Sequence, residues 1–270
     1  MEILSDYSEE AVAAARSALM EVCHVLGEYR EDIVLVGGWV PFFIIPQSHE
    51  HHIGSTDVDL ALNHIHLQEA GYQRIEKLLL GAGYSKAEEP YRFVKTINGI
   101  DVYVDLLAGE YSGTGKKHRH QKVQNLKARK ARGCDLAFDN PVNIKVDGTL
   151  PDGAMDTVTI QAASITSFLV MKGMALATRF KDKDSYDVYY CVSQYPGGYE
   201  RLAKEFKGLV DKPLVREGLS KIRDAFSSID HRGPRDTANS YDVDATEKGR
   251  IRRDSFERVN AFLDLALKGL

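Results

Sequence analysis

The hydrophobic positions in the first part of the chain predict alternating helices and strands. Apolar residues recur at intervals of three and four in residues 8–29 and 66–81, which predicts two amphipathic helices. Short apolar runs rich in β-branched residues at 32–36 and 57–62 are typical of strands. Helices that alternate with strands in this way indicate a sheet covered by helices.

A second pair of apolar runs, residues 91–97 and 100–107, is separated by Asn98 and Gly99. Asn-Gly between two such runs favours a two-residue turn, so we expect an antiparallel hairpin. Further short strand-like pieces follow in residues 134–161, separated by turn signals. These patterns predict a mixed sheet in the first part of the chain.

The apolar pattern changes to helical spacing near residue 160. We therefore expect a sheet-containing domain at 1–160 and a helical domain at 161–270. The polar stretch 230–249 is expected to be a loop. The predicted fold class is α/β (α+β), with a mixed β-sheet core followed by a C-terminal helical domain. The helices expected in the second domain cover residues 163–180, 183–195, 214–228 and 250–267.

Asp57 and Asp59 are the most informative polar residues of this pattern, because they interrupt an apolar strand. Side chains alternate between the faces of a strand, so these two carboxylates share one face while Val58 and Leu60 point to the other. Two carboxylates on one face repel each other, and a cation between them relieves the repulsion. Asp105, on a later expected strand, is a candidate third carboxylate. The three residues predict a site for magnesium or manganese, which prefer oxygen ligands.

The first strand ends in Gly37 and Gly38, which let the backbone turn tightly and let a ligand approach closely. A short helix is expected directly after them, over residues 39–45, and the N-terminus of a helix offers free N–H groups to an anion. An Asp-x-Asp pair by itself is also common on a solvated strand face. Its combination with a glycine turn and a third aspartate favours metal-dependent phosphate chemistry.

The composition is that of a globular protein, with 43% hydrophobic and 27% charged residues and a formal net charge of −4. The charge balance therefore gives no indication of nucleic-acid binding by the chain as a whole. The three cysteines are widely spaced, which argues against a disulfide framework or a cysteine zinc site. The chain begins with an acidic stretch unlike a signal peptide, and no apolar run is long enough to span a bilayer. We expect a cytoplasmic protein that does not associate with membranes.

The segment 116–132 is a local exception, since it contains eight Lys or Arg residues and no acidic residue. Runs of like charge are usually solvated surface segments. This run nevertheless follows the strand that carries Asp105, so its first residues are expected near the candidate metal site. A cationic segment there favours binding to RNA through its phosphates, or to an acidic protein partner. The candidate contact residues are Lys116, Lys117, Arg119 and Lys122.

Three histidines, His49, His51 and His52, lie in the polar segment 47–56. Their order, H-E-H-H, does not match the H-E-x-x-H pattern of a zinc-binding helix. A loop is the favoured interpretation of this segment.

The order of these features resembles a known superfamily. The strand that ends in Gly-Gly, the later Ser-Thr-Asp-x-Asp motif and the aspartate of a following strand are similar to polymerase-β-type nucleotidyltransferases. The stretch from Lys172 to Asp187 resembles the K…AL…R-x-K-x-K-D-x-x-D signature of AbiEii-type nucleotidyltransferase toxins. The resemblance covers residues 33–107 and 165–192. This chain departs from the pattern at the bulky Trp39 after the glycines.

The resemblance implies roles for the residues of the first domain. The turn of Gly37 and Gly38 holds the triphosphate of an NTP, and Ser55 and Thr56 offer hydroxyl groups near its phosphates. Asp57, Asp59 and Asp105 bind the metal, and Asp105 accepts the proton of the attacking hydroxyl.

In the second domain, the resemblance implies that Lys172 neutralises triphosphate charge as part of the catalytic set. Lys183, Asp184 and Asp187 shape the nucleotide site. The ordinary interpretation of these three residues is a solvated helix start, with Asp184 placed favourably in the first turn. Lys172 interrupts an otherwise apolar helix, so it either reaches solvent or faces a charged site.

The implied reaction is transfer of an NMP unit from an NTP to an acceptor hydroxyl, with release of pyrophosphate. The implied acceptor is tRNA or a protein, and the implied biological role is that of a growth-inhibiting toxin with a cognate antitoxin. Two alternatives remain open from the sequence. One is a nucleotidyltransferase that modifies a small molecule such as an antibiotic, and the other is a non-catalytic nucleotide- or partner-binding module of the same fold.

Overall fold

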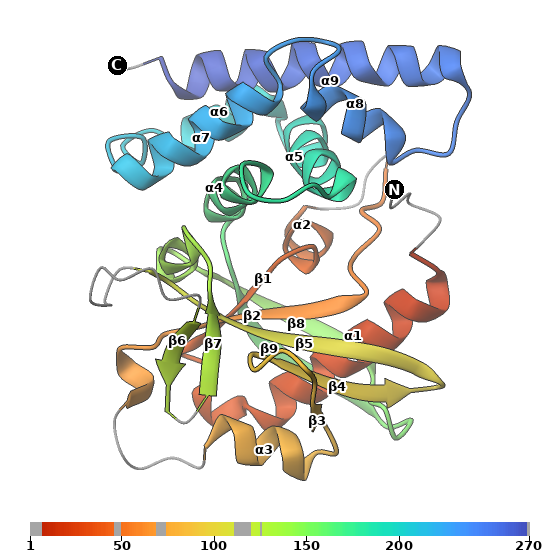
Figure 1. The fold of residues 1–270 in the computed structure, drawn as a ribbon, viewed down its shortest axis with the longest axis vertical. Helices are drawn as coiled ribbons and strands as arrows, with labels where there is room; N and C mark the ends of the chain where they lie inside the picture. Colours follow the sequence, from red (N-terminus) through yellow and green to blue (C-terminus); the bar gives the residue numbers. More distant parts are fainter. Residues whose placement is uncertain (1–6, 46–49, 69–73, 111–119, 125, 269–270) are drawn as a thin grey trace. The chain divides into compact units, whose positions relative to one another are not determined.

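A computed structural model describes residues 7–45, 50–68, 74–110, 120–124 and 126–268 (Figure 1). It confirms the predicted fold class, a mixed α/β protein with C-terminal helices. The chain divides into two compact units. The sheet unit comprises residues 8–40 and 54–164, and the helical unit comprises residues 1–7, 41–53 and 165–270.

This division differs from the expected one in the segment between the turn of Gly37 and Gly38 and the strand that carries Asp57 and Asp59. Residues 41–53 belong to the helical unit, although the sequence places them between two strands of the sheet unit. The helical unit then resumes at Ile165. Helix α2 (Trp39–Ile44) is the element at which the chain first passes from the sheet unit to the helical unit.

The sheet unit is built on a mixed sheet with the strand order β3-β4-β5-β2-β1-β9-β8, and a β6–β7 hairpin joins it through β7 and β5. The pairs β2–β5, β1–β9 and β5–β7 are parallel, while β1–β2, β4–β5 and β8–β9 are antiparallel. The strands are β1 (Ile33–Val36), β2 (Asp57–Leu62), β3 (Ser85–Lys86), β4 (Arg92–Ile97), β5 (Ile100–Ala108), β6 (His120–Val123), β7 (Leu126–Lys130), β8 (Val142–Thr149) and β9 (Met155–Ala162).

The predicted hairpin at Asn98 and Gly99 is confirmed. Ile97 pairs with Ile100, and the two turn residues have φ angles of 53° and 81°. Positive φ at both central residues is the geometry that Asn-Gly adopts readily, and its twist matches the twist of the flanking strands. The turn therefore fixes the register of β4 and β5 and, with it, the position of Asp105.

Helix α1 (Glu9–Val25) covers one face of the sheet and contacts β2, β5, β8 and β9 (Figure 1). Its N-cap is Ser8, whose hydroxyl accepts a hydrogen bond from the N–H of Ala11. The side chains of α1 that face the sheet include three buried alanines, which let the helix lie close to the strands. The apolar residues of β2 and β5 form the other side of this core.

The predicted continuous helix over residues 66–81 is wrong. The described part contains a 3₁₀ turn, η3 (His66–Gln68), and a separate helix, α3 (Ile75–Gly81). Arg74 between them is extended, with φ −66° and ψ 134°. The N–H of Ile75 donates to the side chain of Gln124, 3.2 Å away, so a distant residue satisfies one free donor at the start of α3.

The basic segment also contains structure that its charge pattern does not indicate. Strands β6 and β7 of this segment form a hairpin, and β7 pairs with β5. Leu126 and Ala128 are buried while Lys127 between them is exposed. This period of two is the strand signal, and the surrounding charges conceal it. A 3₁₀ turn, η4 (Cys134–Phe138), follows and contacts β1, β2 and β5.

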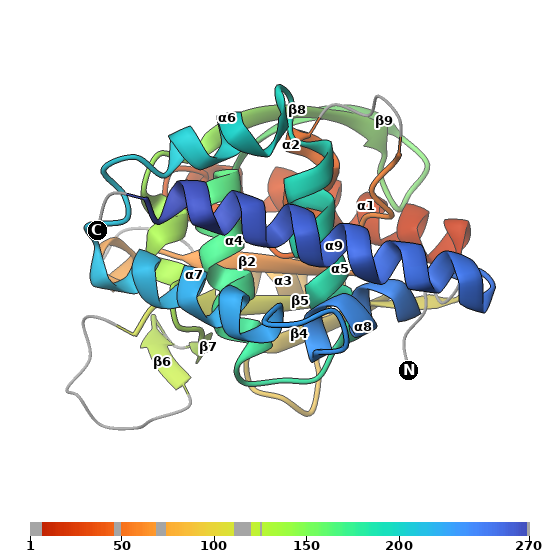
Figure 2. The same cartoon turned by 90° about the horizontal axis from the view of Figure 1, so that it is seen from above.

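The helical unit consists mainly of helices that pack on α5 and α9 (Figure 2). The polar stretch 230–249, predicted to be a loop, contains α8 and the first turn of α9. Asp244 caps α9 by accepting hydrogen bonds from Thr246 N and Glu247 N. The helices of this unit after α2 are α4 (Ile165–Leu176), α5 (Asp182–Gln194), α6 (Gly198–Glu205), α7 (Pro213–Ala225), α8 (Arg232–Asn239) and α9 (Ala245–Ala266). Within the described ranges, no helix is both long and apolar enough to cross a bilayer.

Helices α4 and α7 approach each other backbone to backbone at Gly173 and Gly218. A β-carbon on Gly173 would collide with the carbonyl of Gly218, and one on Gly218 would lie 2.7 Å from Val170 Cγ1. Neither clash is relieved by turning a flexible side chain, because backbone atoms are involved on both sides. The close approach brings the α4 backbone, including the turn that carries Lys172, against α7.

We predict that Gly218→Ala lowers the free energy of unfolding by about 1–3 kcal/mol, because the added methyl group overpacks the α4–α7 contact. Urea denaturation followed by far-UV circular dichroism measures the change. Gly249→Ala is the matched control, since it adds a methyl group to helix α9 where nothing lies within 4 Å. The control is expected to raise stability by up to about 1 kcal/mol. Equal effects of the two substitutions would contradict the proposed close packing.

Candidate functional site

The register of β2 and β5 brings the three predicted carboxylates to one face of the sheet unit. In this parallel pair, Asp59 lies beside Asp105 and Asp57 lies beside Tyr103. Val58 and Val104, which point to the opposite face, are fully buried. Residues that are paired in register point to the same face of a sheet. The expectation that Asp57, Asp59 and Asp105 share a face therefore follows from the observed pairing.

Gly37 provides space for the carboxylate of Asp59. Its φ angle is 75°, in the left-handed region. A β-carbon at this position would collide with Asp59 Oδ2, so the carboxylate lies directly against the backbone of the turn. Gly38, the second glycine, is buried in the same turn. Any other residue at position 37 would both strain the backbone and displace the Asp59 side chain.

Trp39, the bulky residue after the two glycines, fixes the start of β2. Its indole N–H donates to the backbone carbonyl of Asp57 over 2.8 Å, and the side chain is fully buried. The bulky residue after the glycines therefore has a structural role in the sheet unit. It anchors the strand residue that carries the first carboxylate.

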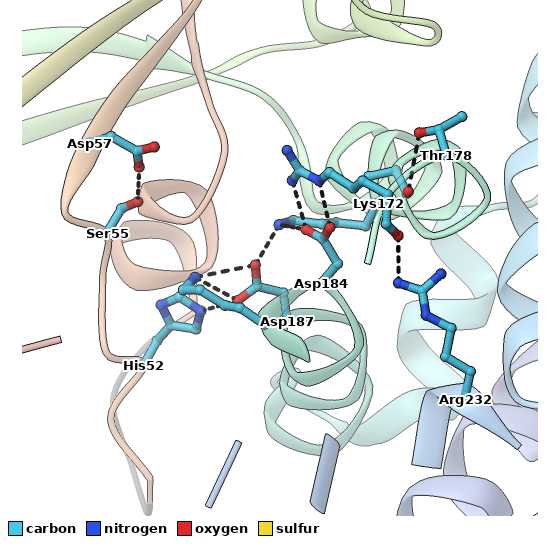
Figure 3. Close-up of polar contacts among 11 residues, drawn as sticks. His52, Ser55, Asp57, Lys172, Thr178, Asp184, Asp187 and Arg232 are labelled. Carbon is cyan, nitrogen blue, oxygen red and sulfur yellow. Dashed lines mark hydrogen bonds and ion pairs between the residues drawn. The ribbon is translucent and has the colours of Figure 1, made fainter. Parts of the chain in front are cut away.

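Ser55 interacts with Asp57 in this structure. The Ser55 hydroxyl donates to Asp57 Oδ1 over 2.6 Å, as Figure 3 shows. Thr56, the other hydroxyl residue expected near the phosphates, is half-buried in the same bend. The serine hydroxyl orients the Asp57 carboxylate, while its other predicted role as a phosphate contact stays a prediction.

Asp105 forms an ion pair with an arginine that the sequence did not single out. Arg92 Nε lies 2.6 Å from Asp105 Oδ1, and Arg92 Nη2 lies 2.8 Å from Oδ2. The Asp105 side chain is nearly buried, at 3% exposure. The Arg92 guanidinium also lies over the ring of Tyr103, 5.0 Å from its centre. Asp105 is therefore held toward β4, and its roles as third metal ligand and proton acceptor stay predictions.

The donor set of this face fits a magnesium ion at Asp57 and Asp59. Magnesium in phosphate-transfer sites usually binds one or two carboxylates together with substrate phosphates. Two neighbouring carboxylates with the Gly37 turn beside Asp59 provide that arrangement. Within the described ranges of the chain, no group of three or more His, Cys, Asp or Glu side chains is arranged to hold a metal ion. Asp57 and Asp59 would hold the ion and phosphate oxygens would complete the coordination, while the role of Asp105 as a third ligand stays a prediction.

The helical unit contains a second set of charged residues, on α4 and α5 (Figure 3). Lys172 Nζ lies 2.7 Å from Asp184 Oδ1 and 2.6 Å from Asp187 Oδ2. Lys183 Nζ lies 2.9 Å from Asp187 Oδ1, and Arg179 Nε lies 2.7 Å from Asp184 Oδ2. Both carboxylates are almost completely buried, at 0–1% exposure. These contacts join the four predicted residues and Arg179 into one network within this unit. We call it the Lys172 network, and it comprises Lys172, Arg179, Lys183, Asp184 and Asp187.

Charge pairing keeps the groups of the Lys172 network ionised despite their burial. Burial alone would lower the pKa of Lys172, but Asp184 and Asp187 offset this and raise it above the ordinary lysine value. Burial would raise the pKa of Asp184, but Lys172 and Arg179 bring it down to about 2. The pKa of Asp187 is likewise held well below its usual range, against burial, by Lys172 and Lys183. Lys172, Lys183 and Arg179 thus share the two buried carboxylates within the network.

His52 is the main member of this site that the sequence did not identify. Its Nε2 lies 2.9 Å from Asp187 Oδ1, and its side chain is fully buried. Burial lowers the pKa of His52 to about 4, which the hydrogen bond to Asp187 only partly counteracts. The neutral ring therefore donates its Nε2–H to the carboxylate. A buried histidine in a polar segment has no periodic pattern around it, so only the fold could reveal this partner.

Two tyrosines fix the segment that carries His52. Tyr190 donates to the carbonyl of Glu50 over 3.0 Å, and Tyr241 donates to Glu50 Oε1 over 2.8 Å. The ring of His52 lies 4.8 Å from that of Tyr190, edge to face. Residues 50–52 are part of the expected loop 46–56, and they are held firmly against α5. His49 lies outside the described residues.

The structure describes one of the four predicted RNA or partner contacts. Lys122 lies on β6 and is exposed. Lys116, Lys117 and Arg119 lie outside the described residues. In the same sheet unit, two arginines lie over tyrosine rings. Arg92 lies over the rings of Tyr91 and Tyr103, and the guanidinium of Arg129 lies 5.8 Å from the centre of the Tyr91 ring.

Comparisons of this chain with protein-family models, with curated proteins and with solved structures find no match.

We predict that His52 makes the protein sensitive to mild acid. An unfolded histidine has a pKa near 6.5, whereas that of folded His52 is about 4, so the unfolded state binds the proton first as the pH falls. The contribution to stability is complete above pH 6.5 and is lost progressively down to pH 4. From pH 7 to about pH 5, His52 alone lowers the free energy of unfolding by about 2 kcal/mol.

Urea denaturation of His52→Gln at both pH values measures this effect, because glutamine keeps a donor but does not titrate. The exposed neighbour provides the control variant His51→Gln. Measurements above pH 5 exclude a contribution from protonation of Asp184 and Asp187, because the pKa values of both carboxyl groups in the folded protein lie below their usual range. A His52→Gln variant that loses as much stability as the unaltered protein would show that His52 is not a buried neutral donor.

Proposed function

We propose that the protein is a magnesium- or manganese-dependent nucleotidyltransferase that transfers an NMP unit from an NTP to an acceptor hydroxyl. The observation that carries this proposal is the pair Asp57 and Asp59 on one face of β2, with the Asp59 carboxylate against the Gly37 turn. Two adjacent carboxylates beside a tight glycine turn are suited to hold a metal ion with the phosphates of a nucleotide.

The proposed reaction is a displacement at the α-phosphorus. The acceptor oxygen forms a bond to the α-phosphorus while the bond from that phosphorus to the β-phosphate bridging oxygen breaks. Pyrophosphate leaves with the electron pair of the broken bond, and the acceptor hydroxyl passes its proton to Asp105, the base that the family resemblance implies. Asp57 and Asp59 would hold the metal, which when bound supplies a Lewis acid for the phosphoryl oxygens. Ser55 and Trp39 orient the first carboxylate of this pair.

The Lys172 network is the proposed source of positive charge for the triphosphate. Its three cations and its burial support binding of an anionic ligand, since an ion interacts more strongly where water is excluded. Asp184 and Asp187 hold Lys172 from two sides, and His52 holds Asp187 in turn. This arrangement supports the role that the family resemblance assigns to the lysine.

The family resemblance also supports the biological part of the proposal. We propose a tRNA or protein acceptor, a cytoplasmic location, and action as a toxin opposed by a cognate antitoxin. The hairpin β6–β7 presents Lys122 at the surface, which supports a polyanionic acceptor or an acidic partner.

One observation favours a second candidate function. Arg92 occupies both oxygens of Asp105, the carboxylate expected to complete the metal site. A non-catalytic nucleotide-binding module of the same fold would be consistent with that pairing. Such a module binds an NTP with magnesium but releases no pyrophosphate.

We predict that Asp57→Asn or Asp59→Asn lowers transfer of label from an α-labelled NTP by at least about 100-fold, because each change removes one anionic metal ligand. Circular dichroism verifies that each variant is folded. Asp101→Asn is the matched control on β5. That aspartate is exposed, and its side chain accepts a hydrogen bond from Thr96. Full activity of either β2 variant would contradict the assignment.

We also predict that neutralising the basic segment weakens RNA binding. Replacing four cations by glutamine should reduce the slope of log affinity against log salt by up to about 3, because each single-strand phosphate contact contributes about 0.7. Filter binding over a range of salt concentrations measures the slope. The four substitutions are Lys116→Gln, Lys117→Gln, Arg119→Gln and Lys122→Gln.

A control with the same change in net charge tests whether the position of the cations matters. An equal loss of affinity and slope in the control would contradict a specific role for the segment. The control substitutions remove four exposed lysines elsewhere, Lys145→Gln, Lys204→Gln, Lys207→Gln and Lys268→Gln.

A further inference from the structure

Phe180 is the most exposed large hydrophobic side chain among the described residues. It lies in the turn between α4 and α5 and is 90% exposed, compared with 37% for Tyr103. A phenylalanine gains about 2 kcal/mol or more from burial, so leaving the ring in solvent forgoes most of that stabilisation. Neither the fold of the helical unit nor the proposed transfer chemistry accounts for an open aromatic ring at this position.

The ring is nevertheless held in a defined place. Arg232 of α8 stacks on it, with the guanidinium carbon 4.5 Å from the ring centre. That guanidinium is itself fixed, because it donates to the backbone carbonyls of Leu176 and Arg179 and, over 3.0 Å, to Asp236. Arg232 therefore supports Phe180 from one side, and the high exposure shows that the ring remains accessible to a ligand.

The surroundings of Phe180 suit a planar ligand that carries negative charge. Arg179 and Lys181 flank it in the chain, and Arg179 belongs to the Lys172 network through Asp184. Asp184 and Asp236 pair with Arg179 and Arg232, while Asp182 is a further, half-buried acid at the start of α5. An aromatic surface supported by arginine, next to the cations of the Lys172 network, matches the chemistry of a nucleotide.

We propose that Phe180 is the stacking surface for an unpaired nucleobase. Its ring covers one face of the base, Arg232 supports the ring from behind, and the phosphates attached to the base are attracted to the Lys172 network. This inference rests on the proposed function and deepens it, because it assigns a base-binding residue. The base belongs either to the NTP or to a single-stranded acceptor, and the two sources share the same chemistry.

Equilibrium binding of Phe180→Ala tests the proposal without requiring turnover. The ligands are an NTP with a methylene group between its α- and β-phosphates, inorganic tripolyphosphate, a short single-stranded RNA and an abasic strand of the same length, each with magnesium. We expect the variant to bind either the NTP analogue or the RNA about 5- to 100-fold more weakly, since base–aromatic stacking contributes on that scale. Binding of the matching ligand without a base should be unchanged.

The two sources of the base give different outcomes. A loss confined to the NTP analogue assigns the base to the nucleotide substrate, and a loss confined to the RNA assigns it to the acceptor. Phe180→Tyr should retain binding, because it keeps the aromatic face. An equal loss for ligands with and without a base, or no loss for any ligand, would overturn the proposal.

A fluorescence measurement provides a second, direct test. The chain has a single tryptophan, Trp39, which is fully buried, so Phe180→Trp adds one exposed reporter. Stacking of a base should quench this reporter, and tripolyphosphate should not. Met155→Trp, at another highly exposed apolar position, is the control and should not be quenched. Quenching of both variants, or of neither, would contradict a specific base site.

These experiments separate the inference from the proposed function. If the unaltered protein transfers no label but Phe180→Ala loses affinity for base-containing ligands, the base site stands and the transferase proposal fails. If transfer occurs and Phe180→Ala binds every ligand normally, the transferase proposal stands and the base site is wrong.

Discussion

Repulsion between Asp57 and Asp59 is the constraint on which the candidate site depends. Strand geometry places both carboxylates on one face of β2, and the apolar residues between and after them fix that face by their burial. The surrounding contacts hold the pair together: Ser55 donates to Asp57, Trp39 anchors its backbone, and Gly37 leaves space for Asp59. We propose that a magnesium ion, bound together with phosphate oxygens, relieves the repulsion between these two carboxylates, and the proposed chemistry follows from that ion.

The helical unit solves the complementary electrostatic problem by burying charges of both signs. Burial of Asp187 is costly unless its charge is paired, and three donors, Lys172, Lys183 and His52, share that task. A neutral histidine satisfies one oxygen without adding a further positive charge. The network therefore stays ionised despite its burial. Replacing such a network with apolar residues is often no less stable, and the proposed binding of a triphosphate would give these buried charges a function beyond stability.

The sequence predicts those features that depend on local pattern. The bounds of β2, the Asn98-Gly99 hairpin, the mixed sheet and the helical second part follow from periodicity and turn chemistry. The face shared by Asp57, Asp59 and Asp105 follows once the strands are assigned. Features that depend on distant partners were missed. Arg92 on Asp105 and His52 on Asp187 have no local signal, α8 lies in a polar stretch, and the charges around β6 and β7 conceal their alternation.

The central claim is that a metal held by Asp57 and Asp59 directs attack at the α-phosphorus of an NTP. The most direct test compares α-labelled and γ-labelled NTPs, each incubated with the protein, magnesium, total RNA and cell extract. The account predicts that label from the α position appears on a macromolecule while label from the γ position is released as pyrophosphate, and that a chelator abolishes both results. Transfer of the γ label, or no transfer from any of the four NTPs, would contradict it.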